Sequence, residues 1–559
     1  MPIIDPDLLE EMRNRNDNEK VKINILMQEQ SDSHALRLEA SRLDTKQERR
    51  DFVIGALKRQ ASTTQSDVLT LLRTMEQDGI VEEIRPLWIV NSISCMANKA
   101  AIARLAQRSE IMTVYHCKES RWLFDDEYIS CIEGENREIA DNLLQVNAQQ
   151  VWELGYTGEG VLIGIIDTGV SLTHADLQGR FWDGGAEYPN HGYDFYSHDN
   201  DPSDERGHGT HVAGTICGTG ASGTQTGIAP GAKIMSLKVF DANELTDEAV
   251  WIEAMQFAVE HGAHVLNMSL GQPLPDASVK FMMRQACDNT LAAGVVAAVC
   301  AGNVRQMQSM IPIPYNIYSP GDCPPPHIHD DQMVNSGGTS CVICVGAVDS
   351  NNNIAGFSSV GPSVWTDVAQ YNDYPYTPGD ATEIGLIRPD ISAPGVHIKS
   401  LDYSNNNGYT LKDGTSMATP LVAGTIALML SKDGELTPEQ IDEILERTAT
   451  PLTEHKSNDF GAGLLNAYAA VMAVGEDGMY ELETVNANVY PNPSNDSFTV
   501  TCHGMRQINV FASDGKLTKS IPTEDETEII SGLEDGVYII QITTEDSITN
   551  HKVIKINTL

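Results

Sequence analysis

The sequence predicts an α/β fold built on a doubly wound, mostly parallel sheet, with a different kind of domain on either side of it. Three observations lead to this prediction. The middle of the chain alternates short apolar strands with helices, the first part mixes strands and helices as small α+β domains do, and the last part is almost entirely strand-like. We therefore expect three regions, at residues 1–135, 136–478 and 479–559.

The first region is expected to be an α+β domain with an antiparallel sheet, followed by a linker. Strand-like runs and stretches with helical periodicity alternate in it. The strands are expected at 21–27, 87–90 and 112–115, and the helices at 36–59, 66–78 and about 98–108. Asn98 suits the N-cap of the last helix, because its short side chain accepts hydrogen bonds from the first turn.

The central region carries the alternation that predicts the parallel sheet. Its short apolar runs are the length of buried strands, and helices follow most of them. Strands are expected at 161–166, 233–239, 265–268, 295–299 and 341–345, and helices at 247–261 and 279–293.

The last region begins with a cluster of chain breakers, Tyr490 to Ser494. Alternating strands are expected after it at 498–501, 508–511, 537–543 and 551–556, with a turn at Ser513 to Gly515. We expect a small β-sandwich of roughly 70–80 residues, near the lower size at which a domain folds alone.

The composition excludes some classes of partner. The chain has 559 residues with 78 acidic and 37 basic side chains, a formal net charge of −41. Binding to a phosphate backbone needs a basic face, so a nucleic-acid partner is excluded. No apolar run approaches the ~20 residues that span a bilayer. The start of the chain does not look like a secretory signal peptide, so either the protein stays in the cytosol or a leader has been removed.

Ten cysteines in a chain of this length do not indicate a disulfide scaffold. Cys323 lies in a proline-rich insert, and Cys341 and Cys344 follow it closely. A disulfide that pins this insert and a set of buried thiols are both open.

Three motifs carry reactive side chains. Asp167 stands at the carboxyl end of an expected strand, where sites form in open α/β sheets. His208 begins a glycine-rich helix, and Ser416 begins an apolar helix whose positive end favours a developing oxyanion. A serine nucleophile needs a base, and the base needs an orienting acid. Asp, His, Ser is one of the three chain orders in which this triad occurs.

Asn303 follows another strand and supplies a fourth element. Its side-chain amide and the backbone N–H of Ser416 are suited to form an oxyanion hole.

These motifs resemble the subtilisin-like serine peptidase (subtilase) family over roughly residues 140–475. Further matches lie at 173–177, 227–232, 268–271 and 388–395. The resemblance implies a subtilisin-like fold in which Asp167 orients His208, His208 is the general base, Ser416 is the nucleophile and Asn303 stabilises the oxyanion. It also implies that substrate binds along the backbone of Ser269, Leu270, Gly271, Ala301, Gly302 and Thr415, as an added β-strand.

The flanking regions have resemblances of their own. Residues 1–135 resemble the family's inhibitory propeptide, a ferredoxin-like domain that assists folding and then plugs the cleft; the alternative is an unrelated α+β domain. The junction is expected between about Lys118 and Glu135. Residues 479–559 resemble the type IX (Por) secretion sorting domain at 490–493, 512–516, 533–538 and 552–556. That implies export followed by release or surface attachment; the alternative is a generic accessory sandwich.

Metal sites are less well defined by the sequence. Carboxylates at 194, 199, 201, 204 and 205 are oxygen ligands of the kind calcium prefers. However, the loop at 218–227 departs from the family's calcium-binding pattern, so Asp176 loses its expected partners. Structural calcium, solvated acids, and a cleft rim at Asp204 and Glu205 that favours basic substrates all stay open. His327 and His329 are expected to lie on a rigid loop at the cleft rim in preference to a zinc site.

The sequence thus predicts a secreted serine endopeptidase, made as a zymogen, that hydrolyses peptide bonds through an acyl-enzyme. Its expected partners are protein or peptide substrates, its own propeptide as an intramolecular inhibitor, and the type IX secretion machinery. No organic cofactor is implied, and we expect a monomer. The alternatives are a pseudoenzyme with this fold and a surface binding protein that its prodomain inhibits permanently.

Overall fold

A computed structural model describes residues 3–123, 138–329, 331–332, 338–366, 368, 371–380, 382–475, 488–490, 494, 497–502, 505–512, 517–523, 525–544 and 548–555. The chain falls into two compact units, Met1–Val474 and Gly475–Leu559, and each is described by itself. Among the described residues, no helix is both long enough and apolar enough to span a bilayer.

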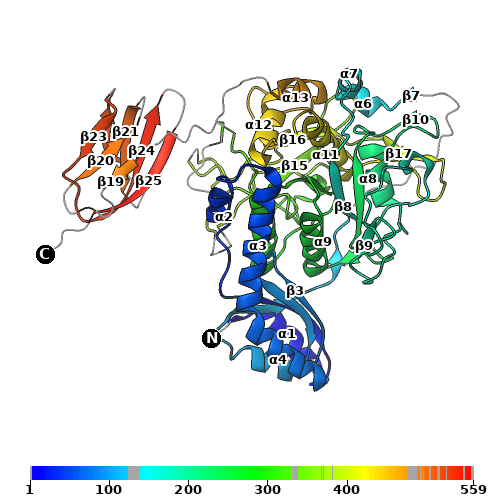
Figure 1. Cartoon of the computed structure of the whole chain (residues 1–559), viewed down its shortest axis with the longest axis horizontal. Helices are drawn as coiled ribbons and strands as arrows, with labels where there is room; N and C mark the ends of the chain where they lie inside the picture. The colour runs from blue at the N-terminus through cyan, green and yellow to red at the C-terminus, as the bar shows by residue number, and fades with distance from the viewer. Residues whose placement is uncertain are drawn as a thin grey trace. The chain divides into compact units, whose positions relative to one another are not determined.

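The first part of the larger unit is a five-stranded sheet in the order β1-β5-β2-β4-β3 (Figure 1). Only the β1–β5 pair is parallel. The strands are β1 (Ile3–Ile4), β2 (Val21–Met27), β3 (Val81–Leu87), β4 (Ser92–Ala97) and β5 (Ile111–His116). One face shares a buried apolar core with the helices α1 (Pro6–Asn14), α4 (Ser66–Gln77) and α5 (Lys99–Leu105). The expected α+β domain with a largely antiparallel sheet is present.

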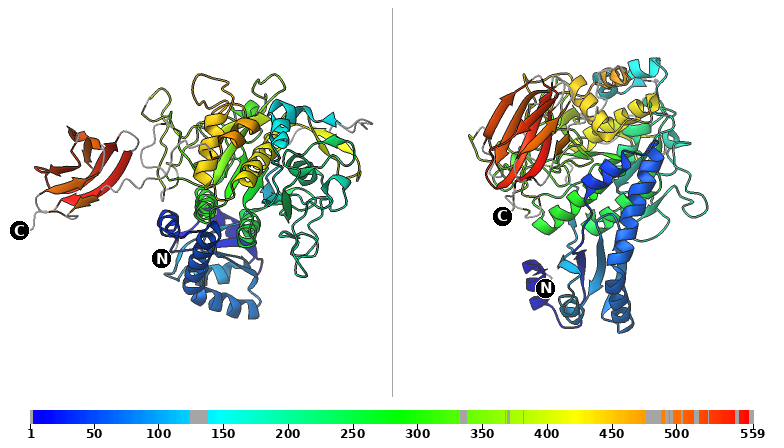
Figure 2. Two further views of the ribbon diagram at one scale, coloured as in Figure 1. Left: turned by 45° about the horizontal axis from the view of Figure 1, so that its top comes forward. Right: turned by 60° about the vertical axis from the view of Figure 1, so that its left-hand side comes forward.

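The opposite face of this sheet packs on two helices of the next region, α9 (Glu248–Glu260) and α10 (Ala277–Ala292). Leu26, Tyr115 and Trp122 share one buried cluster with Trp251 and Met282. The long helix α3 (Lys46–Thr64) extends from the small sheet to the larger region (Figures 1 and 2). This continuous hydrophobic interface joins residues 3–123 to the rest of the unit.

The central region holds a seven-stranded sheet in the order β16-β15-β14-β13-β8-β11-β9. Every pairing in it is parallel. The strands are β8 (Leu162–Asp167), β9 (Gly192–Asp194), β11 (Lys233–Lys238), β13 (Val265–Met268), β14 (Val296–Cys300), β15 (Val342–Val348) and β16 (Ile391–Pro394). The first strand of this sheet, β8, lies in its interior, with β9 and β11 on one side and β13 to β16 on the other. The carboxyl end of β8 is therefore a topological switch point, where α/β sheets form their sites.

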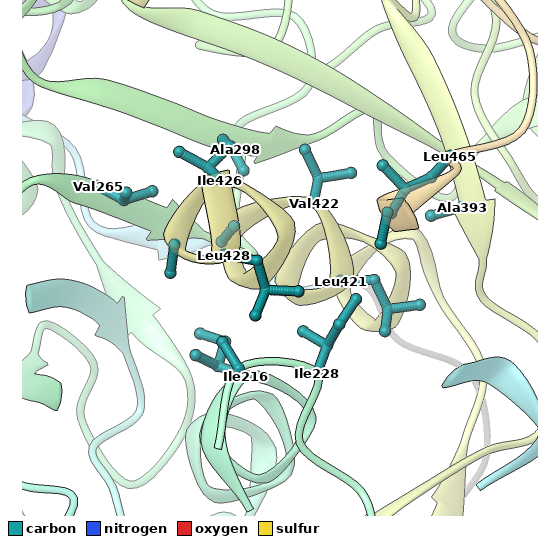
Figure 3. Packing of buried hydrophobic residues seen from close by; sticks show 14 of the residues in the cluster. Ile216, Ile228, Val265, Ala298, Ala393, Leu421, Val422, Ile426, Leu428 and Leu465 are labelled. Atoms are coloured by element: carbon teal, nitrogen blue, oxygen red, sulfur yellow. The ribbon is translucent and has the colours of Figure 1, made fainter. Parts of the chain in front are cut away.

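Helices cover both faces of this sheet, as a doubly wound fold requires. One face packs on α8 (His208–Cys217) and α11 (Thr415–Lys432), and the other on α9 and α10. Figure 3 shows α11 between the sheet and the residues Ile216 and Ile228: Leu421 and Leu428 point toward these two. Residues 415–430 of this helix are buried on all sides, so apolar side chains are found around its whole circumference.

Smaller elements complete the unit. They are α6 (Asp141–Gln145), α7 (Ala148–Glu153), α12 (Pro438–Thr448), α13 (Ala467–Ala473), the single turns η1 (Ala175–Leu177) and η2 (Arg305–Met307), and the pairs β7 (Glu138–Ile139) with β10 (Thr224–Gln225), β6 (Ser120–Arg121) with β12 (Leu245–Thr246), and β17 (Ile398–Leu401) with β18 (Tyr409–Lys412).

The smaller unit contains a three-stranded and a four-stranded sheet. The first holds β19 (Asn488–Tyr490), β20 (Phe498–Thr501) and β23 (Thr527–Ile530), and the second β21 (Met505–Ala512), β22 (Leu517–Pro522), β24 (Gly536–Thr544) and β25 (Ile548–Lys555). Phe498 of one sheet and Ile508 and Ile540 of the other share one buried core. The small β domain is therefore present. The expected breakers at 491–493 and the turn at 513–515 lie outside the described residues.

Two expectations about the first region are wrong. The stretch 36–59 is not one helix but two, α2 (Ser33–Ala40) and α3, because Thr45 and Glu48 form a capping box that starts a new helix. The run 87–90 is not a strand: β3 ends at Leu87, and the chain reverses through Asn91, whose φ is 42°. On the open question of the insert, Cys323, Cys341 and Cys344 are buried free thiols.

Candidate active site

Asp167 and His208 meet at the carboxyl end of β8. Asp167 is the last residue of the strand and His208 the first residue of α8. The Nδ1 atom of His208 lies 2.6 Å from Oδ1 of Asp167, and both side chains are buried. Burial raises the pKa of Asp167, while the charge of the adjacent imidazole and its hydrogen bond lower it. An acceptor fixed at Nδ1 leaves Nε2 as the atom that exchanges a proton.

The position of His208 depends on a glycine beside it. A Cβ atom on Gly209 would lie 2.1 Å from the carbonyl oxygen of Gly169 and 3.1 Å from the Asp167 side chain. Only glycine lets the first turn of α8 approach β8 this closely. The glycine-rich motif around the histidine is therefore what brings the two side chains together.

A second pair of side chains, Thr168 and Asp204, stabilises this contact, whereas the sequence predicted for Asp204 only a calcium-binding, solvated or cleft-rim position. Thr168 Oγ1 donates to Asp204 Oδ1 at 2.9 Å and accepts from the Gly209 N–H at 2.9 Å. Asp204 Oδ2 accepts from the Thr210 N–H at 2.9 Å. Asp204 thus links the end of β8 to the start of α8. Its sequence signal was only an acid shortly before the histidine motif.

Ser416 lies in the first turn of α11, against the segment that follows β13. Its Oγ donates to the Ser269 carbonyl oxygen at 3.1 Å. In return Ser269 Oγ donates to the Ser416 carbonyl oxygen at 2.9 Å. These bonds hold Ser269 beside the serine, at the start of α11.

Asn303 is oriented by the residue that precedes the serine. Its Oδ1 accepts hydrogen bonds from both N and Oγ1 of Thr415, each at 2.9 Å. Thr415 Oγ1 also accepts from the Gly302 N–H at 3.2 Å. With the oxygen of the amide held in this way, its NH₂ group faces away from Thr415. Thr415 is therefore a positioning residue for Asn303.

The chain that leaves the first domain runs along the expected cleft. Ser120 and Arg121 pair antiparallel with Thr246 and Leu245. The Gly271 N–H then donates to the Trp122 carbonyl oxygen at 3.2 Å. Trp122 and Leu123 are buried. Residues 120–123, which we call the tail, thus run alongside Leu245, Thr246 and Gly271.

The other substrate-binding residues implied by the resemblance are buried or contact Tyr318. Leu270 is buried, and the carbonyl oxygen of Ala301 accepts from the Tyr318 N–H at 3.0 Å. Gly302 lies against the Tyr318 ring. Sequence reasoning missed Tyr318, which lies in the proline-rich insert and had no motif around it.

Asp176 does not offer its carboxylate to calcium. Oδ1 accepts from the Ser222 N–H at 2.7 Å, and Oδ2 accepts from the Tyr409 hydroxyl at 2.9 Å. These donors take the place of a cation, so the residues here do not fit one. Of the other acids, Asp194 and Glu205 each lie 3.1 Å from the Lys238 ammonium. Within the described ranges, no group of three or more His, Cys, Asp or Glu side chains is placed to hold a metal ion.

An Asp–His pair and a serine at a helix start, on a doubly wound parallel sheet, are features of serine hydrolases. Comparison with known proteins agrees. Residues 158–463 match the profile of the Subtilase family, and residues 488–557 match that of the Secretion system C-terminal sorting domain.

Proteins similar to this chain include peptidases of Bacillus species. The chain is 31% identical to Bacillopeptidase F of Bacillus subtilis (strain 168) over 470 residues, 78% of this chain and 30% of that relative. It is 34% identical to Subtilisin DY of Bacillus licheniformis over 325 residues, 58% of this chain and 96% of that relative. Subtilisin E of Bacillus subtilis (strain 168) is 33% identical over 326 residues, 58% of this chain and 69% of that relative. The chain belongs to the subtilase family of serine peptidases.

Proposed function

We propose that this subtilase is a secreted serine endopeptidase, made as a zymogen, whose triad is Asp167, His208 and Ser416. The observation that carries the proposal is the buried contact of 2.6 Å between His208 Nδ1 and Asp167 Oδ1 at the switch point of the sheet. We assign residues 1–135 to the propeptide, 136–478 to the catalytic domain and 479–559 to the sorting domain.

The chemistry follows from the roles of the three side chains. Ser416 Oγ attacks the carbonyl carbon of the substrate peptide while His208 Nε2 takes its proton. Asp167 holds the imidazole in the required tautomer and stabilises the imidazolium. His208 then donates the proton to the leaving amine, and water hydrolyses the acyl-enzyme by the same steps.

The oxyanion is assigned to the Asn303 amide and the Ser416 N–H. Support comes from the two hydrogen bonds that Thr415 donates to Asn303 Oδ1, since they turn the NH₂ group away from Thr415. One such donor stabilises the transition state by about 2.7–4 kcal/mol, a magnitude measured in subtilisin itself. No organic cofactor is needed for these steps.

Inhibition by the first domain is supported by the path of the tail. A strand that pairs with Leu245 and Thr246 and accepts from Gly271 lies where an extended substrate would bind. The tail therefore competes with substrates. Processing is assigned to the segment between about Lys118 and Glu135; from residue 124 on, this segment lies outside the described residues.

Export is supported by the match of residues 488–557 to the Secretion system C-terminal sorting domain. We propose that the type IX secretion machinery recognises residues 479–559 and that the enzyme works outside the cell or on its surface.

The test is covalent labelling by a fluorophosphonate, a reagent that reacts with activated serines. After self-processing, the wild-type protein should be labelled on the peptide that contains Ser416, and Ser416→Ala should not be labelled. Ser431→Ala is the matched control, because Ser431 is at the other end of α11 and donates only to the Leu428 carbonyl oxygen in the same helix. Wild-type protein that loses its first domain only when another protease is added, and then still takes no label, would favour a pseudoenzyme. A chain that is never processed would favour permanent inhibition.

A further inference from the structure

Two stretches of backbone lie on either side of Ser416. One is Ser269–Gly271 after β13, joined to Ser416 by the two hydrogen bonds through Ser269. The other is Ala301–Asn303 after β14, joined to α11 through Thr415. The space between these walls is where the side chain of a substrate residue must go if its carbonyl group is to reach Ser416 Oγ.

The tail indicates the direction in which a substrate runs. The Gly271 N–H donates to a carbonyl oxygen of the tail, so a bound peptide follows the first wall as a β-strand. Side chains of a strand alternate between its two faces. A peptide with one carbonyl group at Ser416 therefore directs the side chain of that same residue between the two walls.

Tyr318 occupies this space. A Cβ atom on Gly302 would lie 2.7 Å from ring atoms Cγ and Cδ1 of Tyr318, and one on Gly271 would lie 2.7 Å from the Tyr318 Cβ. The ring is thus in contact with the backbone of one wall, and its base with the backbone of the other. The residue is 2% exposed.

The backbone around Tyr318 is hydrogen-bonded to both walls. The Tyr318 N–H donates to the Ala301 carbonyl oxygen at 3.0 Å. Ser319 and Gln272, the residue after the first wall, exchange two bonds, at 3.0 and 2.9 Å. A ring fixed on two sides does not leave the slot by a simple rotation, since close-packed neighbours resist such shifts.

We propose that Tyr318 fills the side-chain slot beside Ser416 and restricts this peptidase to bonds that follow a small residue: Gly, Ala or Ser. The inference rests on the proposed function, because it concerns the substrate of the same site. A large side chain would have to displace the ring, and a single methylene in a hydrophobic pocket already changes kcat/KM by about 10–200-fold. Discrimination of at least about a hundredfold between Ala and Phe is expected.

The experiment uses the self-processed full chain and quenched fluorescent peptides that differ only in the residue before the cleaved bond: Ala, Leu or Phe. Wild type should have a kcat/KM for the Ala peptide at least a hundredfold above that for the Phe peptide. Tyr318→Gly should raise the ratio of kcat/KM for the Phe peptide to kcat/KM for the Ala peptide by about a hundredfold. Tyr318→Phe is the matched control: it keeps the ring and should keep the preference.

Two wild-type measurements keep the inference falsifiable if Tyr318→Gly does not fold. Mass spectrometry of a casein digest should show cuts mainly after small residues. The N-terminus produced by self-processing should also follow one, so a self-cut directly after Leu123 or Phe124 would overturn the inference. So would equal kcat/KM for Ala and Phe in wild type, or an unchanged ratio in Tyr318→Gly. Failure of the proposed function would look different: no peptide would be cut by any variant, and Ser416 would not be labelled.

Discussion

We expect the binding of the first domain to the catalytic domain to depend on pH, because Glu248 lies at the start of α9 between them. The Asn24 amide donates to Glu248 Oε1 at 2.6 Å, and the carboxyl group is wholly buried beneath the small sheet. Burial, helped by the neighbouring charge of Asp247, raises the pKa of Glu248 to about 8. Asp276 adds a weaker effect in the same direction, and Lys22 pairs with Asp247.

The direction of this pH dependence follows from the difference in the pKa of Glu248 between the complex and the separated domains. When the first domain leaves, Glu248 is exposed and its pKa falls toward the ordinary value of 4.5. The complex therefore binds a proton that the separated domains release, so association is strongest at low pH and weakens as pH rises between about 4.5 and 8. One pKa unit corresponds to about 1.36 kcal/mol, so affinity should fall by up to about tenfold per pH unit. From pH 5.5 to 7.5 the loss is up to about a hundredfold.

The perturbation is Glu248→Gln, which keeps the acceptor for Asn24 but cannot ionise. The assay is the lag before casein hydrolysis begins after self-processing, measured at pH 5.5, 6.5 and 7.5 for wild type and variant side by side. The ratio of the two lags at each pH removes the pH dependence of catalysis itself. We expect a lag that shortens with pH in wild type and a long, much flatter lag in the variant. Equal pH dependence of the two lags would refute the reasoning.

Two further changes test other parts of the account. Asn303→Ala should lower kcat by about 10²–10³, the range known from subtilisin, with a smaller effect on KM in steady-state peptide assays; an unchanged kcat would exclude Asn303 as an oxyanion donor. Lys456→Met should leave the buried carboxylate of Glu446 without its ion-pair partner, while Asp390 keeps its pair with Arg388. In the Ser416→Ala background, urea unfolding should then show a loss of about 3–5 kcal/mol; a loss below 1 kcal/mol would contradict it.

Helices and strands whose ends are determined by neighbouring residues were predicted best from the sequence. The strand at 265–268 was predicted to the residue, because Val265, Leu266 and Met268 make a short, mostly apolar run directly after a predicted helix. Asp247 and Asn98 marked helix starts correctly, since both side chains accept from the first turn. The stretch 36–59 failed because its apolar spacing continues across a capping box that ends one helix and begins another.

The parts of the site that the sequence did not reveal depend on contacts between distant segments. Asp167, His208, Ser416 and Asn303 each stand in a short motif, so they could be proposed from sequence. Tyr318 stands in no motif and matters only because the insert folds back between the two walls. The partner of Asp176 was equally hidden: the Tyr409 hydroxyl comes from 233 residues further along the chain.

The central claim is that Ser416 makes this chain a self-processing endopeptidase. The most direct test incubates wild type and Ser416→Ala in parallel with casein and follows intact mass and the N-terminal sequence over time. We expect wild type alone to lose its first domain by a cut between about Lys118 and Glu135, and then to digest casein. If both chains remain whole and casein survives, the claim is contradicted; if Ser416→Ala is processed and digests casein like wild type, the nucleophile has been assigned wrongly.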